Sequence, residues 1–352
     1  KNYFYILDII YFWRITRNNK FKNSFDWHGV NIFDSCSQLL WKSIIVFWPH
    51  LISLENTSKR ISKNYKPSKV LLYSYEYIYG KAIMRGILKA KSNTEIIGLQ
   101  HGPITPMKFM YNNLSEKLKI ENKELEGCPV PNKYLLDGKS ASDVLINSGV
   151  KKSMIRVVGP IRFNDVWKNK LTRENSGGSI NILIAPGLHD SEFVLNFSLK
   201  VLKNKKNINI TIKPHPKINI EKINKIICEQ TESSTIPNNI KLVTEGNIYS
   251  IFNKNDFFIT TYSSTGVEAI AFDLPVIVLL SNEVPDMSLY FGQNDIALKS
   301  GNEIELMNHL DKLISDESFR ENYLHNLKRV FSESFYIKES TTERFKSVFL
   351  NE

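Results

Sequence analysis

Short apolar runs alternate with longer stretches of helical period along most of the chain. The runs are apolar throughout rather than alternating with polar residues, which is typical of parallel strands buried on both faces. Strands are predicted at residues 69–74, 95–100, 133–137, 155–159, 180–185, 208–213, 240–243, 257–261 and 276–280. Crossover helices are predicted at residues 77–91, 140–148, 191–205, 219–230 and 264–272. The pattern therefore predicts an α/β fold with two doubly wound units.

A polar stretch rich in Gly and Ser, "KNKLTRENSGGS" at residues 168–179, has no apolar period and predicts the domain boundary. A length of 352 residues also suits two domains. We expect one domain at 1–170 and a second at 178–330. A terminal helix is expected at 331–352, and one arrangement for it is packing back on the first domain. Residues 1–65 are predicted to be helical or irregular.

The charge balance narrows the possible partners. The chain has 46 Lys and Arg against 36 Asp and Glu, a formal charge of +10. A basic excess suits nucleic acid, an anionic membrane face or phosphorylated substrates. The chain has no long Lys/Arg block, zinc-finger spacing or RNP-like motif, which argues against nucleic acid. An apolar content of 42% argues against disorder.

The cysteines and the N-terminal segment bear on location. Cys36, Cys128 and Cys228 lie far apart, which favours free thiols in a reducing compartment. The segment "KNYFYILDIIYFW" is interrupted by Asp8 and ended by Arg14, so it is shorter than the roughly 20 residues of a spanning helix. It also lacks the features of a signal peptide. We expect a cytoplasmic protein, with peripheral contact to the inner membrane face as one option.

Ligands of open α/β sheets bind beyond the carboxyl ends of the strands, so the residues there are candidates for chemistry. In "TTYSSTGVEAIAFDLPVIVL" a strand ends, Ser263 and Ser264 follow, and a helix starts at about Thr265. Hydroxyls and free N–H groups at a helix start can hold an anion. Glu268, one turn later, could accept hydrogen bonds from a ribose. The alternative is a capping box of Thr265 and Glu268 that needs no ligand.

"KPHP" holds His215 between two prolines directly after the strand at 208–212. A following proline pushes the preceding residue to extended geometry, so the backbone direction at Lys213 and His215 is restricted. If this strand neighbours the strand before Ser263, His215 faces the same crevice and can donate to a phosphate oxygen. Lys213 would add positive charge. The alternative is a histidine whose hydrogen bonds are satisfied within the turn and that binds no ligand.

Two strand ends of the first half carry further candidates. In "IIGLQHGPITP" the strand is followed by His101 at the domain rim and by Gly102, which permits positive φ or a close approach. Glu76 lies between a strand and a helix, and a carboxylate there facing an interdomain cleft suits a general base. Its alternative role is that of an acid favoured by the helix dipole.

A similar stretch, "GLHDSEF", follows the strand at 180–185 and places His189 and Asp190 ahead of a helix. Either Asp190 or Ser191 could simply be the helix cap. The sequence has no HExxH, DxD or paired-histidine pattern for a metal, and neither of the Gly-rich phosphate loops. A nucleotide would then be bound by hydroxyls, imidazoles and helix starts.

The order of "KPHP" and then "YSSTGVEAIAFDLPVIVL" resembles the second domain of GT-B glycosyltransferases. It looks most like the bacterial enzymes that use CMP-activated acidic sugars, the sialyltransferases and Kdo transferases of capsule and lipopolysaccharide synthesis. Their HP and SS motifs match His215-Pro216 and Ser263-Ser264. Gly266 and Glu268 match a nucleotide-sugar segment of GT-B enzymes, and "GLQHGP" resembles a first-domain motif. The resemblance covers roughly residues 69–290.

The resemblance implies a GT-B fold of two Rossmann-like domains facing a central cleft, with acceptor binding in the first and donor binding in the second. It implies that His215 contacts the CMP phosphate and assists its departure, and that Ser263 and Ser264 hold that phosphate. The acidic motif of sialyltransferases is not evident, so Glu76 is our first choice of base and His101 the second. Residues expected at the donor are Lys213, Pro216, Ser263, Ser264, Thr265, Gly266, Glu268, Gly187 and His189, and on the acceptor side Gln100 and Gly102.

The resemblance implies an inverting transferase without metal or other cofactor, which moves a 2-keto-3-deoxy acidic sugar from CMP to a surface glycan or lipid-linked glycan. Two alternatives of the same architecture are a UDP-sugar 2-epimerase and a polyol-phosphate transferase. A third, from another class, is a noncatalytic GT-B-like module in glycan assembly.

Overall fold

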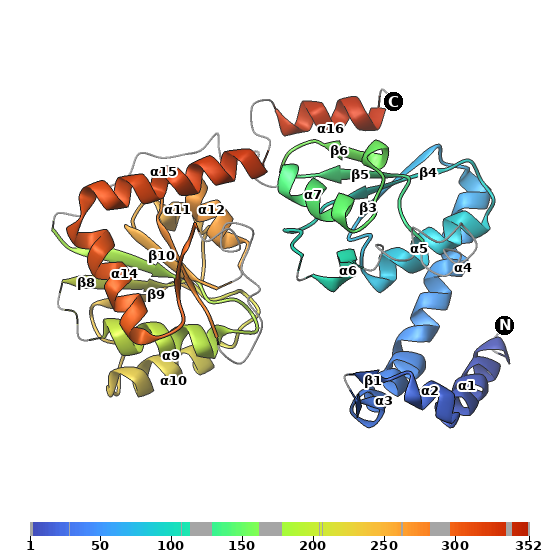
Figure 1. Cartoon of the computed structure of the whole chain (residues 1–352), viewed down its shortest axis with the longest axis horizontal. Coiled ribbons are helices and arrows are strands. Elements are labelled where there is room, and N and C mark those ends of the chain that lie inside the picture. Colours follow the sequence, from blue (N-terminus) through green and yellow to red (C-terminus); the bar gives the residue numbers. More distant parts are fainter. Residues whose placement is uncertain are drawn as a thin grey trace. The chain divides into compact units, whose positions relative to one another are not determined.

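The computed structural model describes residues 3–27, 29–106, 108–112, 129–161, 178–203, 205, 207–261, 263–281, 296–335 and 340–350 (Figure 1). By its internal contacts the chain divides into two compact units, residues 1–99 with 120–134 and residues 100–119 with 135–352. Two larger sheets organise the fold, one of four strands and one of six.

The N-terminal segment, predicted to be helical or irregular, is mainly helical and includes one small hairpin. Its helices and small antiparallel hairpin are α1 (Tyr3–Thr16), α2 (Asn19–Asn23), β1 (Asp26–Trp27), β2 (Val30–Asn31), α3 (Phe33–Lys42) and α4 (Trp48–Tyr65). A π-helical turn, Ser43–Phe47, joins α3 to α4. It lies just before Pro49, which lacks an N–H and would clash with the carbonyl four residues back in a regular helix. The wider turn is a local adjustment at that proline.

The four-stranded sheet has the order β3-β4-β5-β6. Its strands are β3 (Lys69–Tyr73), β4 (Glu95–Leu99), β5 (Lys133–Leu136) and β6 (Ile155–Val157), with helices α5 (Ile78–Lys89), α6 (Phe109–Asn112) and α7 (Lys139–Asn147). β3 and β4 pair in parallel. A Cβ on Gly80 would lie 2.6 Å from the carbonyl oxygen of Ser74, so this glycine lets α5 pack directly on the turn that follows β3.

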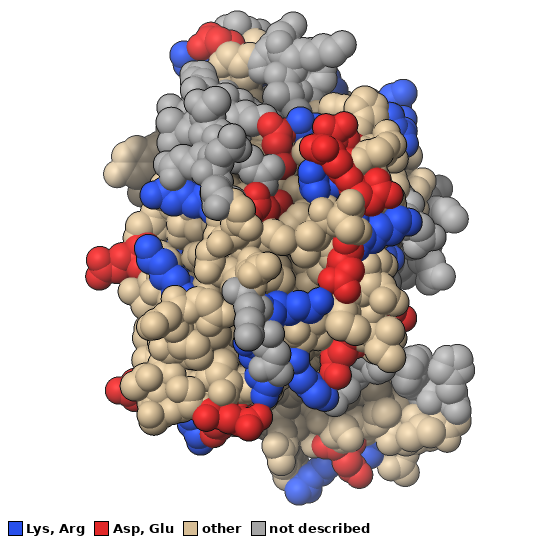
Figure 2. Space-filling view, turned by 90° about the vertical axis from the view of Figure 1, so that its left-hand side faces the viewer, with Lys and Arg blue, Asp and Glu red and all other residues tan. Residues whose placement is uncertain are grey.

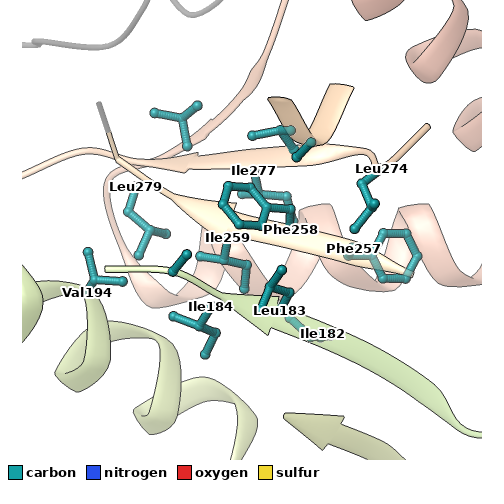
Figure 3. Close-up of a cluster of buried hydrophobic side chains, with 14 of the residues drawn as sticks. Ile182, Leu183, Ile184, Val194, Phe257, Phe258, Ile259, Leu274, Ile277 and Leu279 are labelled. Atoms are coloured by element: carbon teal, nitrogen blue, oxygen red, sulfur yellow. The ribbon is translucent and has the colours of Figure 1, made fainter. Parts of the chain in front are cut away.

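The six-stranded sheet is parallel throughout and has the order β12-β11-β10-β7-β8-β9. Its strands are β7 (Ile180–Ile184), β8 (Ile208–Ile212), β9 (Ile240–Leu242), β10 (Phe257–Thr260), β11 (Val276–Leu279) and β12 (Leu298–Ser300). Its helices include α9 (Ser191–Leu202), α10 (Ile220–Thr231), α11 (Tyr249–Phe252), α12 (Thr265–Ala271) and α14 (Glu303–Ser315). Side chains on β7 and β10 are buried together, and Figure 3 shows Ile184 and Ile259 side by side in this core. Because helices cover both faces, no polar alternation is needed along these strands.

Two further helices end the described chain, α15 (Glu317–Ser334) and α16 (Thr341–Leu350). The buried hydroxyl of Tyr323 on α15 donates to the Val276 carbonyl (2.5 Å) and accepts from the Leu298 N–H (2.9 Å), which fixes α15 against the sheet edge. Arg344 on α16 donates to the carbonyl of Val157 at the end of β6.

Charges of both signs are interspersed on the face of the molecule in Figure 2. Ion pairs of this kind join α9 to neighbouring helices, as Lys200 does with Glu303 (2.6 Å) and Lys222 with Glu192 (2.9 Å). Exposed pairs contribute little to stability, so they serve mainly to balance charge there.

The predicted strands all form, and each begins at the predicted residue and ends one or two residues earlier. β12, at Leu298–Ser300, was not predicted because it is short and contains a lysine. The α/β class with two parallel-sheet Rossmann-like domains is confirmed. Most of the predicted boundary at 168–179 lies outside the described residues, as does Cys128, so the domain limits stay predictions. Cys36 and Cys228 are free thiols.

Candidate functional site

The strand order of the six-stranded sheet reverses between β7 and β10. From β7 the chain proceeds outward through β8 to β9, and from β10 it proceeds outward on the other side through β11 to β12. In open α/β sheets, ligands usually bind beyond the strand ends at such a reversal, so the loops after β7 and β10 are the candidate ligand site. Residues 185–190 follow β7, and Thr261, Ser263 and Ser264 follow β10.

Asp190 and Thr261 join the two loops by a hydrogen bond from the threonine hydroxyl to the carboxylate Oδ2. Asp190 precedes α9, but its side chain makes no bond to the helix start, so it is not the simple cap that the sequence left open. Its other oxygen, Oδ1, is buried and has no hydrogen-bond partner among the described residues. A Cβ on Gly187 would lie 2.7 Å from Oδ1, so the carboxylate fills the space that a side chain at 187 would need.

The start of α12 is built by Ser263 rather than by the predicted capping box. The Ser263 hydroxyl donates to the Thr265 hydroxyl (2.9 Å) and accepts from the Thr265 N–H (3.2 Å). Thr265 is thus the first helical residue, and Ser264 before it makes no side-chain cap bond. Gly266 is buried and Glu268 half-buried in the first turn. Two half-buried hydroxyls and the helix start therefore lie directly beyond β10.

His215 lies in a turn beyond β8. Its Nδ1 accepts from the Lys217 N–H (3.2 Å) and its carbonyl accepts from the Ile218 N–H (2.9 Å). Because Nδ1 accepts this hydrogen bond, we assign the proton of the neutral ring to Nε2. The side chain is exposed, as are those of Pro216 and His189. His215 can therefore present an N–H donor to an anion.

His215 and Ser263 do not follow neighbouring strands, because β7 pairs with both β8 and β10 and lies between them. The condition attached to the sequence prediction is thus not met. Two strand spacings amount to about 10 Å, so only a ligand lying across the end of β7 would reach both loops.

Lys213 is buried, and its ammonium group is already engaged by the chain. Nζ donates to the carbonyls of Thr244 (3.0 Å) and Glu245 (3.2 Å) in the loop after β9. Such bonds satisfy a buried cation and fix that loop beside β8. The structure thus places Lys213 as a support for its neighbours in the sheet.

The candidates of the four-stranded sheet also follow strand ends. Glu76 is buried, in the turn between β3 and α5. Partial burial raises the pKa of the adjoining Tyr77 above its ordinary value, and the negative charge of Glu76 and then Tyr73 add to this rise. The turn is tight, with Ser74 at a left-handed φ of 64°. The carboxylate is thus held in a restricted, largely dry position.

Gln100 is buried and uses both ends of its amide. Nε2 donates to the Gly102 carbonyl (2.9 Å), and the side-chain oxygen accepts from the Asp137 N–H (2.9 Å). It ties the loop after β4 to the loop after β5, with His101 half-buried between. Gly102 has no positive φ, and no described atom would lie within 4 Å of its Cβ. Within the described protein, Gly102 is therefore required neither for a positive φ nor for a close approach of neighbouring atoms.

Among the described residues, no group of three His, Cys, Asp or Glu side chains is arranged to hold a metal ion. A helix long and apolar enough to cross a membrane is likewise not found in the described ranges.

Sequence reasoning named most of the strand-end residues but missed Thr261 and the bond that it makes. The only sequence feature that marks Thr261 is its position as the last residue of the largely apolar run "FFITT". Its partner Asp190 drew attention only as a helix cap.

The segment that contains these loops matches a known protein family. Residues 190–281 match the model of a family described as "Capsule polysaccharide biosynthesis protein". The match begins at Asp190 and includes "KPHP" and "YSSTG". No curated protein matches the sequence.

Solved structures resemble most of the chain at low sequence identity. A MnaA–UDP co-structure from S. aureus has a TM-score of 0.59 at 16% identity, covering 86% of this chain and 81% of that one. A putative UDP-N-acetylglucosamine 2-epimerase from Listeria monocytogenes scores 0.57 at 13% identity, with coverage of 86% and 80%. The lipopolysaccharide outer core galactosyltransferase WaaB scores 0.51 at 12% identity, with coverage of 87% and 81%. These similarities show that the chain has the two-domain Rossmann-like fold of glycosyltransferases and epimerases.

Proposed function

We propose that the protein is a nucleotide-sugar-dependent glycosyltransferase of surface-polysaccharide synthesis. The observation that carries the proposal is the reversal of strand order at β7 and β10, with Asp190, Thr261, Ser263 and Ser264 on the two loops that follow these strands. The capsule-family match over residues 190–281 and the similarity to WaaB support the same reading.

The donor phosphate would lie near Ser263 and Ser264, where hydroxyls and the start of α12 favour an anion. Nε2 of His215 would reach the phosphate from the far side of β7 and stabilise the departing CMP. Lys213, held by two carbonyls, would act by fixing the loop beside His215 rather than by contact.

We propose an inverting displacement without a metal. The acceptor hydroxyl attacks the anomeric carbon, the bond to the phosphate oxygen breaks, and CMP leaves with the electron pair. The hydroxyl proton passes to a base, for which Glu76 is the first candidate and His101 the second. The HP and SS motifs favour a CMP-linked 2-keto-3-deoxy acidic sugar, with a surface glycan as acceptor. Activity in the cytoplasm and at the membrane face is part of the same proposal.

A UDP-sugar 2-epimerase is the second candidate, because two of the similar structures carry that name. It differs from a transferase in needing no acceptor. A CDP-dependent polyol-phosphate transferase would differ in its donor.

Thermal unfolding with CMP, UDP and CDP tests the proposal, because a ligand that binds only the native state raises Tm. We expect CMP to raise Tm most and a CMP-linked acidic sugar to be transferred or slowly hydrolysed. A Tm rise with UDP and isomerisation of a UDP-sugar would favour the epimerase, and a response to CDP the polyol-phosphate transferase. No response to any nucleotide would indicate a noncatalytic module.

The role of His215 is tested by His215→Ala, which should lower turnover by at least about tenfold through loss of a donor to the leaving group. His325→Ala is a matched control, since this histidine is exposed on α15. Wild-type turnover in His215→Ala, with the control also unchanged, would contradict the assignment.

A further inference from the structure

Helix α1 exposes five of its large apolar side chains and turns its only acid, Asp8, inward. Ile6, Leu7, Ile10, Tyr11 and Trp13 are between 42% and 67% exposed. These positions, with Arg14 and Arg17, share one side of a helix at spacings of three and four residues. We call this side the α1 face.

The opposite side of α1 makes the contacts with the protein. Asp8 accepts a hydrogen bond from the indole N–H of Trp48 on α4 (3.1 Å). The Phe12 ring meets the Trp41 ring on α3 edge to face, with centroids 5.2 Å apart. Figure 1 shows α1, α2 and α3 gathered at the N-terminal end of α4. The inward side of α1 is apolar as well, with Ile9, Phe12 and Ile15 half-buried, so the helix carries large apolar side chains on both sides and the described protein covers only one of them. An apolar face of this kind marks an interaction site.

Positive charge accompanies the α1 face. Arg14 and Arg17 lie at its C-terminal end, and the Arg17 guanidinium is 3.7 Å above the centre of the Trp13 ring. Lys20 and Lys22 follow on α2. Residues 1–66 contain ten Lys and Arg against four Asp and Glu, which is +6 of the chain's +10.

We propose that the α1 face binds an anionic lipid surface, with the helix lying in the plane of the membrane. Apolar side chains would enter the region beneath the headgroups, and the arginines and lysines would remain among the phosphates. Trp13 and Tyr11 are of the type enriched at this depth. The helix has 14 residues, fewer than the roughly 20 that crossing requires.

Charge favours lipid over a second copy of the chain as the occupant. The α1 face includes Arg14 and Arg17, Lys20 and Lys22 follow in the sequence on α2, and the only acid of α1, Asp8, is bound on the other side. A second α1 face would bring the same cations and no acid to pair with them, since a two-fold interface joins identical patches. Anionic headgroups supply the missing negative charge.

This proposal deepens the membrane part of the proposed function. Co-sedimentation with vesicles tests it without any nucleotide sugar, so its failure would remove the membrane contact and leave the proposed transfer reaction standing. We expect the 352-residue chain to bind phosphatidylcholine vesicles that contain about a third phosphatidylglycerol, and to bind pure phosphatidylcholine at least about tenfold more weakly. Because the attraction is electrostatic, high salt should weaken binding.

Two variants address the two components of the α1 face. Ile6→Ser with Ile10→Ser removes apolar contact, and Arg14→Glu with Arg17→Glu reverses charge; each should reduce binding at least about tenfold. Ile304→Ser with Met307→Ser on α14 and Lys151→Glu with Lys152→Glu are matched controls at exposed positions and should bind as wild type. Circular dichroism checks that every variant is folded.

Equal binding to the two kinds of vesicle, or unchanged binding by folded α1 variants, would overturn the proposal. So would a chain that is dimeric in gel filtration, becomes monomeric with Ile6→Ser and Ile10→Ser, and does not bind vesicles. That result would identify a second copy as the occupant.

Discussion

At the scale of residues, Gly187 and Asp190 depend on each other. The carboxylate is held by Thr261, and its Oδ1 lies where a Cβ at 187 would be. Gly187→Ala should therefore displace Asp190 and destabilise the protein by about 1–3 kcal/mol, the usual cost of overpacking. Denaturant unfolding measures this cost.

A double-mutant cycle separates this clash from any general intolerance at position 187. In an Asp190→Ala background the obstructing oxygen is gone, so the added methyl group should cost close to nothing. The two substitutions would then show a coupling of about 0.5–3 kcal/mol. Additive effects would mean that the glycine is required for another reason.

The residue scale also shows where sequence reasoning stops. His215 and the two serines could be named because they directly follow apolar runs that had to be strands. The engagement of Lys213 by the loop after β9 could not be predicted, because it depends on which strands are neighbours. For the same reason Thr261 was overlooked, since its partner is 71 residues away along the chain.

At the scale of elements, the partly buried side chain of His309 joins α14 to β12. Nδ1 of His309 lies 3.0 Å from the hydroxyl of Ser300, which is fully buried at the end of β12. Burial lowers the pKa of His309 below its ordinary value of 6.5; the charge of Glu305 opposes this change and that of Lys312 adds to it. The folded protein thus favours the neutral ring.

This shift predicts acid sensitivity with a definite sign. Below about pH 6.5 the histidine of the unfolded chain takes up a proton more readily than that of the folded chain, so protonation favours unfolding. The contribution of His309 to stability is complete above this pH and is lost as the pH falls through its lowered folded pKa. His309→Gln should reduce the decline of Tm between neutral pH and pH 5. An identical decline in wild type and variant would show that other groups cause it.

Elements were the most predictable level. Buried parallel strands need only an apolar run, which identified nine of them with their first residues. The last residue of each strand was predicted one or two positions too late. Residues such as Lys213 and Ala185 directly follow the apolar run but lie beyond the paired part of the strand. The π-helical turn before Pro49 was not predicted. A proline indicates that a regular helix will be disturbed, but not what form the disturbance takes.

At the scale of the whole molecule, two proposed sites lie on separate elements. The nucleotide loops belong to the six-stranded sheet, and the α1 face belongs to the N-terminal helices. The total charge of +10 suggested both an anionic donor and an anionic membrane. Only the structure shows that the apolar residues beside Arg14 and Arg17 face outward, because periodicity identifies a helix face but not what covers it.

Hydrogen exchange should therefore distinguish the two ligands within one chain. The nucleotide that raises Tm should slow exchange in peptides covering residues 185–190 and 261–268, because bound loops open less often. Anionic vesicles should instead slow exchange in residues 3–24 and leave the two loops unchanged. The Arg14→Glu and Arg17→Glu variant should lose the vesicle effect and keep the nucleotide effect, which a general loss of folding cannot produce. Protection of residues 3–24 by nucleotide alone would show that the two sites are coupled, and a lack of protection there by anionic vesicles would show that the assignment of α1 to lipid is wrong.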